Sequence, residues 1–365
     1  MALRKVFPRQ GHQREGGEKD VLLHRLRAEC RHFRNHDFRN AVTENLVNSG
    51  TLEAIIKRSY TSPDGREVPF GGLNGTLATQ VSRASRLGGA SCSGRRVPHV
   101  DVRVDSVIDV AVSLQEASAD LPHCNKVAIL FAGHTPLTLN GERGICQEES
   151  ELLGRTNWCE AFFKVNCCEQ QQHLALNAPS VEASQFCDQG YIQAGAPECL
   201  VAENLWLMRH SSRSSDTSPG AWRAEPREFS AVCFLPESSP PLMNNADGRG
   251  HHPKAASSVS PTSSGKTKYA ADESRLAYRR QVESAIKVCC LLDCDGIAVG
   301  CAEGVCGSEL YGHPLAEVTE VWRDVLSQMA AQFRVVSFAL GKDTPSNRRC
   351  TTGFLAEALG AKAVS

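Results

Sequence analysis

Two adjacent glutamates, Glu148 and Glu149, follow Gln147 at the predicted start of a helix. Neighbouring carboxylates suit general acid/base catalysis, because each raises the proton affinity of the other and one can stay protonated near neutral pH. Adjacent helical residues point about 100° apart, so both can reach one ligand only at the helix entrance. Acids in a first helical turn are also favoured by the helix dipole without any catalytic role. The pair is therefore either a candidate catalytic site or two acids that only stabilise the start of the helix.

The elements around this pair predict where it lies. Residues Val127–Ala132 are apolar throughout, as in a strand that is buried on both faces. A polar loop follows, and the helix is then predicted by apolar residues at three- and four-residue spacing: Leu152, Leu153, Cys159, Phe162 and Phe163. A strand that runs through a loop into a helix places the helix start near the carboxyl end of the sheet, where ligand crevices form.

Strand and helix patterns alternate along the rest of the chain. Val100, Val102 and Val104 alternate with polar residues and predict a half-buried edge strand, and Asp105 or Ser106 is placed to cap the next helix. Further strands are predicted at 199–210, 229–235, 297–299 and 334–340, and helices at 276–290 and 317–329. This order favours an α/β fold with helices on both faces of a mixed, largely parallel sheet.

Composition divides the chain into three parts. Residues 1–36 are polar and Arg-rich and are expected to form a flexible basic extension, and residues 37–95 predict an N-terminal helical region. That region is broken at Ser49-Gly50 and contains a turn at Pro63-Asp64-Gly65. Residues 96–365 form the predicted α/β core, in which the Ser-, Pro- and Gly-rich segments 211–227 and 236–274 are expected to be disordered inserts.

Charge and cysteine content exclude several classes of function. The 40 basic and 41 acidic residues of this 365-residue chain leave no global field that would hold nucleic acid or an anionic membrane. No apolar run approaches the ~20 residues of a membrane span, so we expect a soluble intracellular protein of the cytoplasm and/or nucleus. The 16 cysteines form no paired C-x-x-C, which predicts buried reduced thiols and no zinc site. His251-His252 lies in a predicted insert and is a weak metal signal.

Residues 126–163 resemble the core of the microbial-type poly(ADP-ribose) glycohydrolases. That family has a three-layer α/β/α macrodomain-like fold, and its pattern is a buried strand, an Asn-Pro-Gly-Gly-Gly loop and Gln-Glu-Glu opening a helix. In this chain Gln147-Glu148-Glu149 is intact, and Pro136 lies at the family's distance before it. Outside the inserts, the resemblance extends from about residue 37 to residue 359.

The glycine loop departs from the family pattern. Leu137, Thr138 and Leu139 stand in place of the three glycines, and Asn140-Gly141 comes just after them. A later run is similar to the family's second ligand loop and contains Gly300, Gly304 and Gly307.

The resemblance implies a reaction and a role for each site residue. Glu149 would be the general acid that protonates the leaving oxygen of a ribose-ribose O-glycosidic bond, and would then orient the attacking water as a base. Glu148 would bind the distal ribose hydroxyls. The implied partner is ADP-ribose or a poly(ADP-ribosyl)ated protein, no cofactor is needed, and the binding residues would be Gln147, Pro136, Asn140, Gly141, Gly300, Gly304 and Gly307.

The substituted glycines leave three functions open. A glycine loop lets backbone N–H groups close on a diphosphate, and leucine side chains on a tight turn obstruct that approach. The chain is therefore expected to be a hydrolase of this type, a macrodomain that binds ADP-ribose without cleaving it, or an interaction protein of the same fold.

Overall fold

The computed structural model describes residues 50–72, 75–76, 98–116, 123–133, 147–158, 199–211, 220–237, 239–244, 267–302, 304–307, 311–329, 333–341 and 348–364. The expected basic extension 1–36 and His251-His252 lie outside these residues. So does most of the predicted N-terminal helical region.

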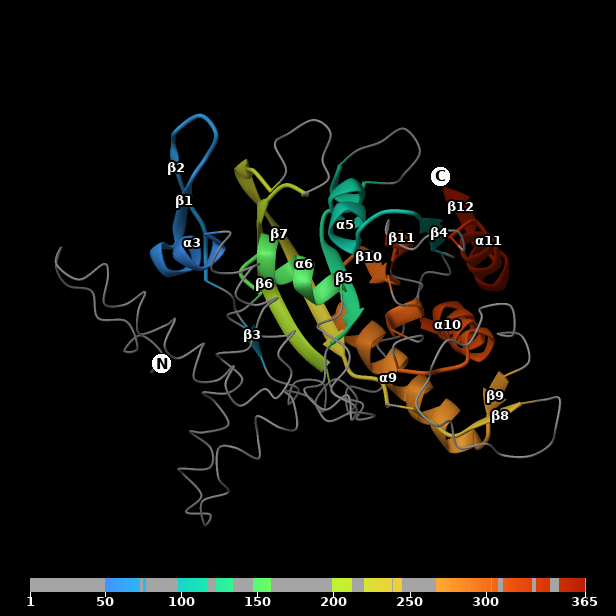
Figure 1. Cartoon of the computed structure of the whole chain (residues 1–365). Coiled ribbons are helices and arrows are strands. Elements are labelled where there is room, and N and C mark those ends of the chain that lie inside the picture. Colours follow the sequence, from blue (N-terminus) through green and yellow to red (C-terminus); the bar gives the residue numbers. More distant parts are fainter. Residues whose placement is uncertain are drawn as a thin grey trace, which may run out of the picture.

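An eight-stranded sheet forms the centre of the molecule (Figure 1). Its order is β12 (Lys362–Val364), β4 (His99–Arg103), β11 (Val335–Ala339), β10 (Gly296–Gly300), β5 (Val127–Ala132), β7 (Trp222–Phe234), β6 (Cys199–Arg209) and β3 (Gly75–Thr76). The pairs from β12 to β7 are parallel, whereas β7–β6 and β6–β3 are antiparallel. The predicted mixed, largely parallel sheet is confirmed.

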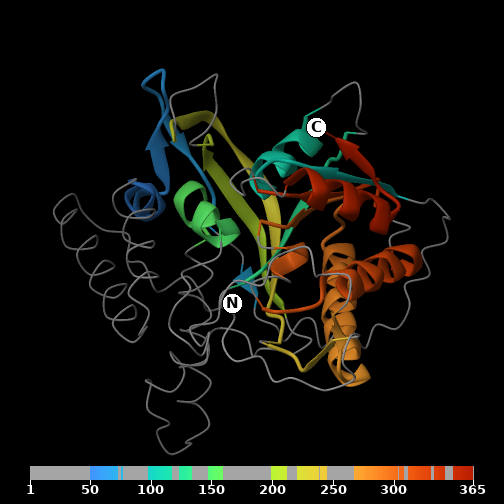
Figure 2. The same ribbon diagram turned by 45° about the vertical axis from the view of Figure 1, so that its right-hand side comes forward.

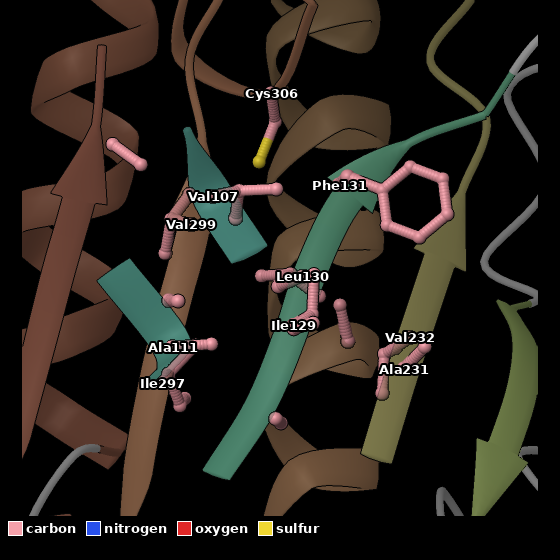
Figure 3. Packing of buried hydrophobic residues seen from close by; sticks show 14 of the residues in the cluster. Val107, Ala111, Ile129, Leu130, Phe131, Ala231, Val232, Ile297, Val299 and Cys306 are labelled. Atoms are coloured by element: carbon pink, nitrogen blue, oxygen red, sulfur yellow. The ribbon is translucent and has the colours of Figure 1, made fainter. Parts of the chain in front are cut away.

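The middle strands are buried along their whole length. All six residues of β5 and all five of β10 and β11 are buried, as expected for parallel strands covered on both faces. Ile129, Leu130 and Val299 of these strands belong to the same buried apolar cluster as Val107 and Ala111, which lie on the helix that crosses one face (Figure 3). The prediction of a fully buried strand at Val127–Ala132 is confirmed.

Helices cover both faces of this sheet (Figures 2 and 3). On one face lie α5 (Val107–Gln115) and α6 (Gln147–Arg155), and behind the sheet lies α9 (Asp272–Leu291), against which α10 (Leu315–Met329) packs. The last helix, α11 (Arg348–Leu359), contacts α10 and β4. The expected α/β architecture is thus present. Within the described ranges, no helix combines the length and the apolar character needed to cross a bilayer.

Near the N-terminus, a short helix and a hairpin lie against β7. Gly50 has φ 77° and precedes α3 (Thr51–Lys57), in agreement with the predicted break at Ser49-Gly50. The strands β1 (Ser59–Thr61) and β2 (Glu67–Pro69) pair in antiparallel fashion around the predicted Pro63-Asp64-Gly65 turn. The described part of the N-terminal region therefore contains a hairpin as well as a helix.

The prediction that the Val100 strand lies at the sheet edge is wrong. β4 lies between β11 and β12, so among the described strands β12 is the outermost one at this end of the sheet. Asp101, one of the polar residues that alternate with these valines, is fully buried, and it accepts hydrogen bonds from Arg103 and from the Ser337 hydroxyl. An alternating pattern predicts a half-buried strand, but a buried ionic group produces the same pattern.

The expected disordered inserts are wrong in part. Trp222–Arg227 belongs to β7, where the Trp222 ring stacks on Tyr60 at 4.8 Å and carries the Arg209 guanidinium at 3.6 Å on its ring. β8 (Leu242–Asn244) and β9 (Thr267–Tyr269) pair within the second predicted insert, and α9 begins before that insert was expected to end. Contacts with residues distant in sequence order these segments, and local composition does not report such contacts.

Candidate active site

The helix that carries the glutamate pair is held at its C-terminal end by an ion pair to α5. Arg155 Nη2 donates to Asp109 Oδ1 at 2.7 Å, and Ser106, the N-cap of α5, donates from its hydroxyl to Asp109 Oδ2 at 2.8 Å. Burial alone would raise the pKa of Asp109, but the charge of Arg155 and the hydrogen bonds lower it below its usual value. This pairing fixes α6 relative to the start of α5.

Glu148 reaches from α6 to the carboxyl end of β10. Its Oε1 atom accepts a hydrogen bond from the backbone N–H of Ala302 at 2.8 Å, and the residue is 7% exposed. A Cβ atom added to Gly300 would lie 2.8 Å from Cγ of Glu148, so the glutamate side chain occupies the space beside that glycine. The first acid of the pair is therefore in contact with the turn that follows β10.

A small cavity lies beside this contact. Its walls come from the start of α5, from α6, from the turn after β10 and from the end of β11: Ser106, Val107, Glu148, Glu151, Ala302, Ala339 and Gly341. The cavity is small, with a volume of ≈ 10 Å³, which is room for about one water molecule. Because these parallel strands end at the same edge, the cavity lies where α/β proteins bind ligands.

The two glutamates have different surroundings. Glu148 contributes to the cavity wall. Glu149 has no exposed surface, and it is not one of the described residues that line the cavity. Adjacent helical side chains diverge by about 100°, which accounts for this difference. In this conformation the pair presents one carboxylate to the cavity.

The fold is shared with solved structures of one enzyme. The poly(ADP-ribose) glycohydrolase from Thermomonospora curvata matches with a TM-score of 0.54 and 16% identity, over 88% of this chain and 99% of the other. The same enzyme bound to the inhibitor ADP-HPD matches with a TM-score of 0.51 and 15% identity, over 89% of this chain and 98% of the other. No protein-family model and no curated protein matches the sequence.

The chain shares the fold of this T. curvata enzyme. At this identity the likeness establishes architecture, and the site has to be argued from its own residues. Gln147 opens α6 together with the glutamate pair, as its position in the sequence predicted. Pro136, Asn140 and Gly141 lie outside the described residues.

The second predicted ligand loop is described in part. Gly300 ends β10 against Glu148, Gly304 has φ 83° and forms a β-bridge with Ala302, and Gly307 ends the 3₁₀ turn η3 (Val305–Gly307). The structure thus brings Glu148 and Gly300 together. Whether these glycines contact a ligand stays a prediction.

Sequence reasoning missed most of the cavity wall. The sequence predicted Ser106 only as a possible helix cap, and it predicted no role for the Ala302 amide or for Gly341. A glycine directly after the last buried strand, as at Gly341, was a usable turn signal. The Ala302 amide had none, because any residue type offers the same backbone N–H.

Buried aromatic residues support the far side of the same turn. The hydroxyl of Tyr278 donates to the carbonyl of Val305 at 3.4 Å and accepts from Trp322 Nε1 at 3.1 Å. Tyr311 donates its hydroxyl to the carbonyl of Gly133, which directly follows β5. The turn after β10 is therefore tied to α9, α10 and the end of β5.

His313 joins this aromatic cluster as a neutral ring. Its Nε2 atom lies 2.8 Å from the carbonyl of Glu237 and must donate, because a carbonyl only accepts. Its Nδ1 atom then accepts from the Tyr269 hydroxyl at 2.7 Å. Burial lowers the pKa of His313 to about 4.

The described cysteines agree with the prediction of buried thiols. Among the cysteines whose side chains the structure describes, all are buried except Cys290, which is half-buried. Burial raises the pKa of Cys124 to about 12 and that of Cys294 to about 11, and it also raises the pKa of Cys306 well above its usual value. These thiols are protonated near neutral pH and pack as small apolar side chains.

Proposed function

We propose that the chain is a poly(ADP-ribose) glycohydrolase-like hydrolase that cleaves the ribose-ribose O-glycosidic bond of ADP-ribose conjugates. The observation that carries the proposal is the Glu148 carboxylate in the wall of a cavity at the carboxyl ends of parallel strands, on a helix opened by Gln147-Glu148-Glu149. The shared fold supports it. The substrate is ADP-ribose in polymer or on a modified protein, and the site of action is the cytoplasm or nucleus.

The reaction assigns different work to the two carboxyl groups. Glu149 protonates the leaving ribose oxygen as the bond to the anomeric carbon breaks through an oxocarbenium-like state. It then accepts a proton from the water that attacks that carbon. Glu148 hydrogen-bonds the distal ribose hydroxyls. Because Glu149 is fully buried without ligand, the reaction needs the entrance of α6 to turn toward the bound sugar.

Turnover of poly(ADP-ribose) by Glu149→Gln tests this proposal. Glutamine keeps the size of the side chain but can neither donate nor accept the catalytic proton, so release of ADP-ribose should fall by about 10²–10⁴-fold. Glu283→Gln is the matched control, because Glu283 lies on α9 behind the sheet in an ion pair with Arg279. Chromatography of released ADP-ribose measures both variants. Equal turnover by Glu149→Gln and wild type would remove the acid assignment.

A macrodomain that binds ADP-ribose without cleaving it is the second candidate. The leucines and threonine at residues 137–139, in place of the family's three glycines, favour it. Calorimetric titration of the wild-type chain with ADP-ribose separates the candidates. Heat of binding without turnover identifies the non-catalytic binder, and the absence of heat leaves an interaction protein of the same fold.

A further inference from the structure

A hydrogen bond joins the Glu148 carboxylate to the turn after β10. Residue 148 is 154 positions from Ala302 in sequence, yet its Oε1 atom accepts the Ala302 amide at 2.8 Å in a largely buried setting. Hydrogen bonds from a backbone N–H to a carboxylate are about twice as strong as those between neutral groups. The contact therefore joins α6 firmly to the backbone of the turn.

Gly300 is glycine for reasons of space. An added Cβ would lie 2.8 Å from Cγ and 3.0 Å from Oε1 of Glu148, which is closer than side chains approach. The φ of Gly300 is not positive, so its backbone conformation does not demand glycine. β10 is also held in place, because Gly300 pairs with Ala339 of β11. Any larger residue at position 300 must displace the Glu148 side chain.

The turn itself is strained. Cys306 has φ 47° and ψ 50°, a left-handed conformation that costs a non-glycine residue about 1 kcal/mol or more. Such a conformation persists only where surrounding contacts hold it. Tyr278 holds Val305 from the α9 side, and Glu148 holds Ala302 from the α6 side.

We propose that Glu148 is a positioning residue for this site: its carboxylate holds the turn after β10 in place through the Ala302 amide, and Gly300 leaves the room for it. The proposal deepens the proposed function, since that turn borders the proposed ligand site. Its tests on the free protein do not depend on catalysis.

Hydrogen exchange at Ala302 in the full chain is the first test. Glu148→Ala removes the acceptor and should speed exchange of the Ala302 amide by roughly 10- to 100-fold. Glu148→Gln keeps an oxygen acceptor at the same place and should restore most of the protection. Glu148→Met keeps most of the side-chain length without an oxygen acceptor, so exchange as slow in this variant as in wild type would mean that Glu148 only fills space. Exchange at Ala302 as slow in Glu148→Ala as in wild type overturns the proposal.

A double-mutant cycle on thermal unfolding is the second test. Gly300→Ala should lower Tm by about 2–6 °C, because overpacking strains a closed site. In a Glu148→Ala background the same change should lower Tm by less than half as much, since the obstructing Cγ is gone. Additive effects overturn the steric part of the proposal.

Gly296→Ala is the matched control for that cycle. Gly296 begins the same strand, and its added Cβ would lie 2.8 Å from Sγ of Cys124, the same separation as at Gly300. Its effect on Tm should be unchanged by Glu148→Ala. If Glu148→Ala also reduced the Tm loss caused by Gly296→Ala, the substitution would loosen the whole strand, and this result would overturn the proposal.

Failure of this proposal is distinguishable from failure of the proposed function. If wild-type chain releases no ADP-ribose but the exchange and unfolding results are as expected, the hydrolase proposal falls and the positioning role stands. If turnover is present, Gly300→Ala should raise KM for poly(ADP-ribose), because Glu148 is displaced from its place. A KM for Gly300→Ala equal to that of wild type would contradict the proposal that Gly300 leaves room for Glu148 at the ligand site.

Discussion

The turn after β10 has two sides, and they differ in chemistry. On the α6 side a single carboxylate, from Glu148, holds the Ala302 amide beside a cavity. On the α9–α10 side the fully buried rings of Tyr278 and Trp322 and the neutral ring of His313 pack without an ion pair among them. The α9–α10 side is packed like a protein core, whereas the α6 side places the Glu148 carboxylate in the wall of the cavity.

The largest expected effect on this comparison comes from Trp322→Ala. Trp322 is fully buried, packs edge-on against Phe338 at 5.5 Å and donates to Tyr278. Its truncation should cost about 3–5 kcal/mol in the free energy of unfolding. Urea denaturation measures the loss, and Trp322→Phe, which keeps most of the volume, should lose clearly less. If both variants unfold like wild type, stability does not reside on the α9–α10 side.

A smaller effect is expected from the pH dependence of stability. Burial lowers the pKa of His313 from 6.5 to about 4, so the unfolded chain binds the proton more tightly than the folded one. Above pH 6.5 the ring is neutral in both states, so His313 does not change the free energy of unfolding. As pH drops from 6.5 toward 4 the unfolded chain takes up the proton, and the free energy of unfolding falls by up to about 3 kcal/mol.

Urea denaturation at a series of pH values measures this slope. His313→Gln has no titrating ring, so its stability should fall less steeply than that of wild type across the same window. His210, whose pKa burial also lowers, is present in both proteins and cancels in the difference. Parallel slopes for the two proteins would rule out His313 as a source of acid sensitivity.

The smallest expected effect lies on the α6 side. Ser106 accepts from the N–H of Asp109 at 3.2 Å as the cap of α5, so Ser106→Ala should cost about 1 kcal/mol. Ser327→Ala on α10 removes an exposed hydroxyl that donates to Asp324 and should change stability by less than about 0.5 kcal/mol. Thermal unfolding compares the two. A cost for Ser106→Ala as large as for Trp322→Ala would erase the contrast between the sides.

Local pattern predicted the elements well where the pattern had one cause. The apolar run Val127–Ala132 has the length and composition of a strand buried on both faces, and Ser106 precedes an apolar stripe at helical spacing; the structure has β5 and α5 at these places. It misled where a distant partner changed the meaning of a residue. Asp101 lies at a polar position of an alternating pattern, but it is buried and hydrogen-bonded to Ser337 and Arg103. Trp222 lies in a predicted disordered insert, but its ring stacks on Tyr60.

Residue pattern predicted the alternation of strands and helices and the place of Glu148 at a helix start, and the family resemblance predicted the fold. The order of the strands, the contact of Glu148 with the Ala302 amide and the lack of space at Gly300 became visible in the folded chain alone. The physical reason is range: backbone propensity and apolar periodicity act over a few residues. The contact between Glu148 and Ala302 joins residues 154 positions apart, and every residue type except proline carries the same backbone amide.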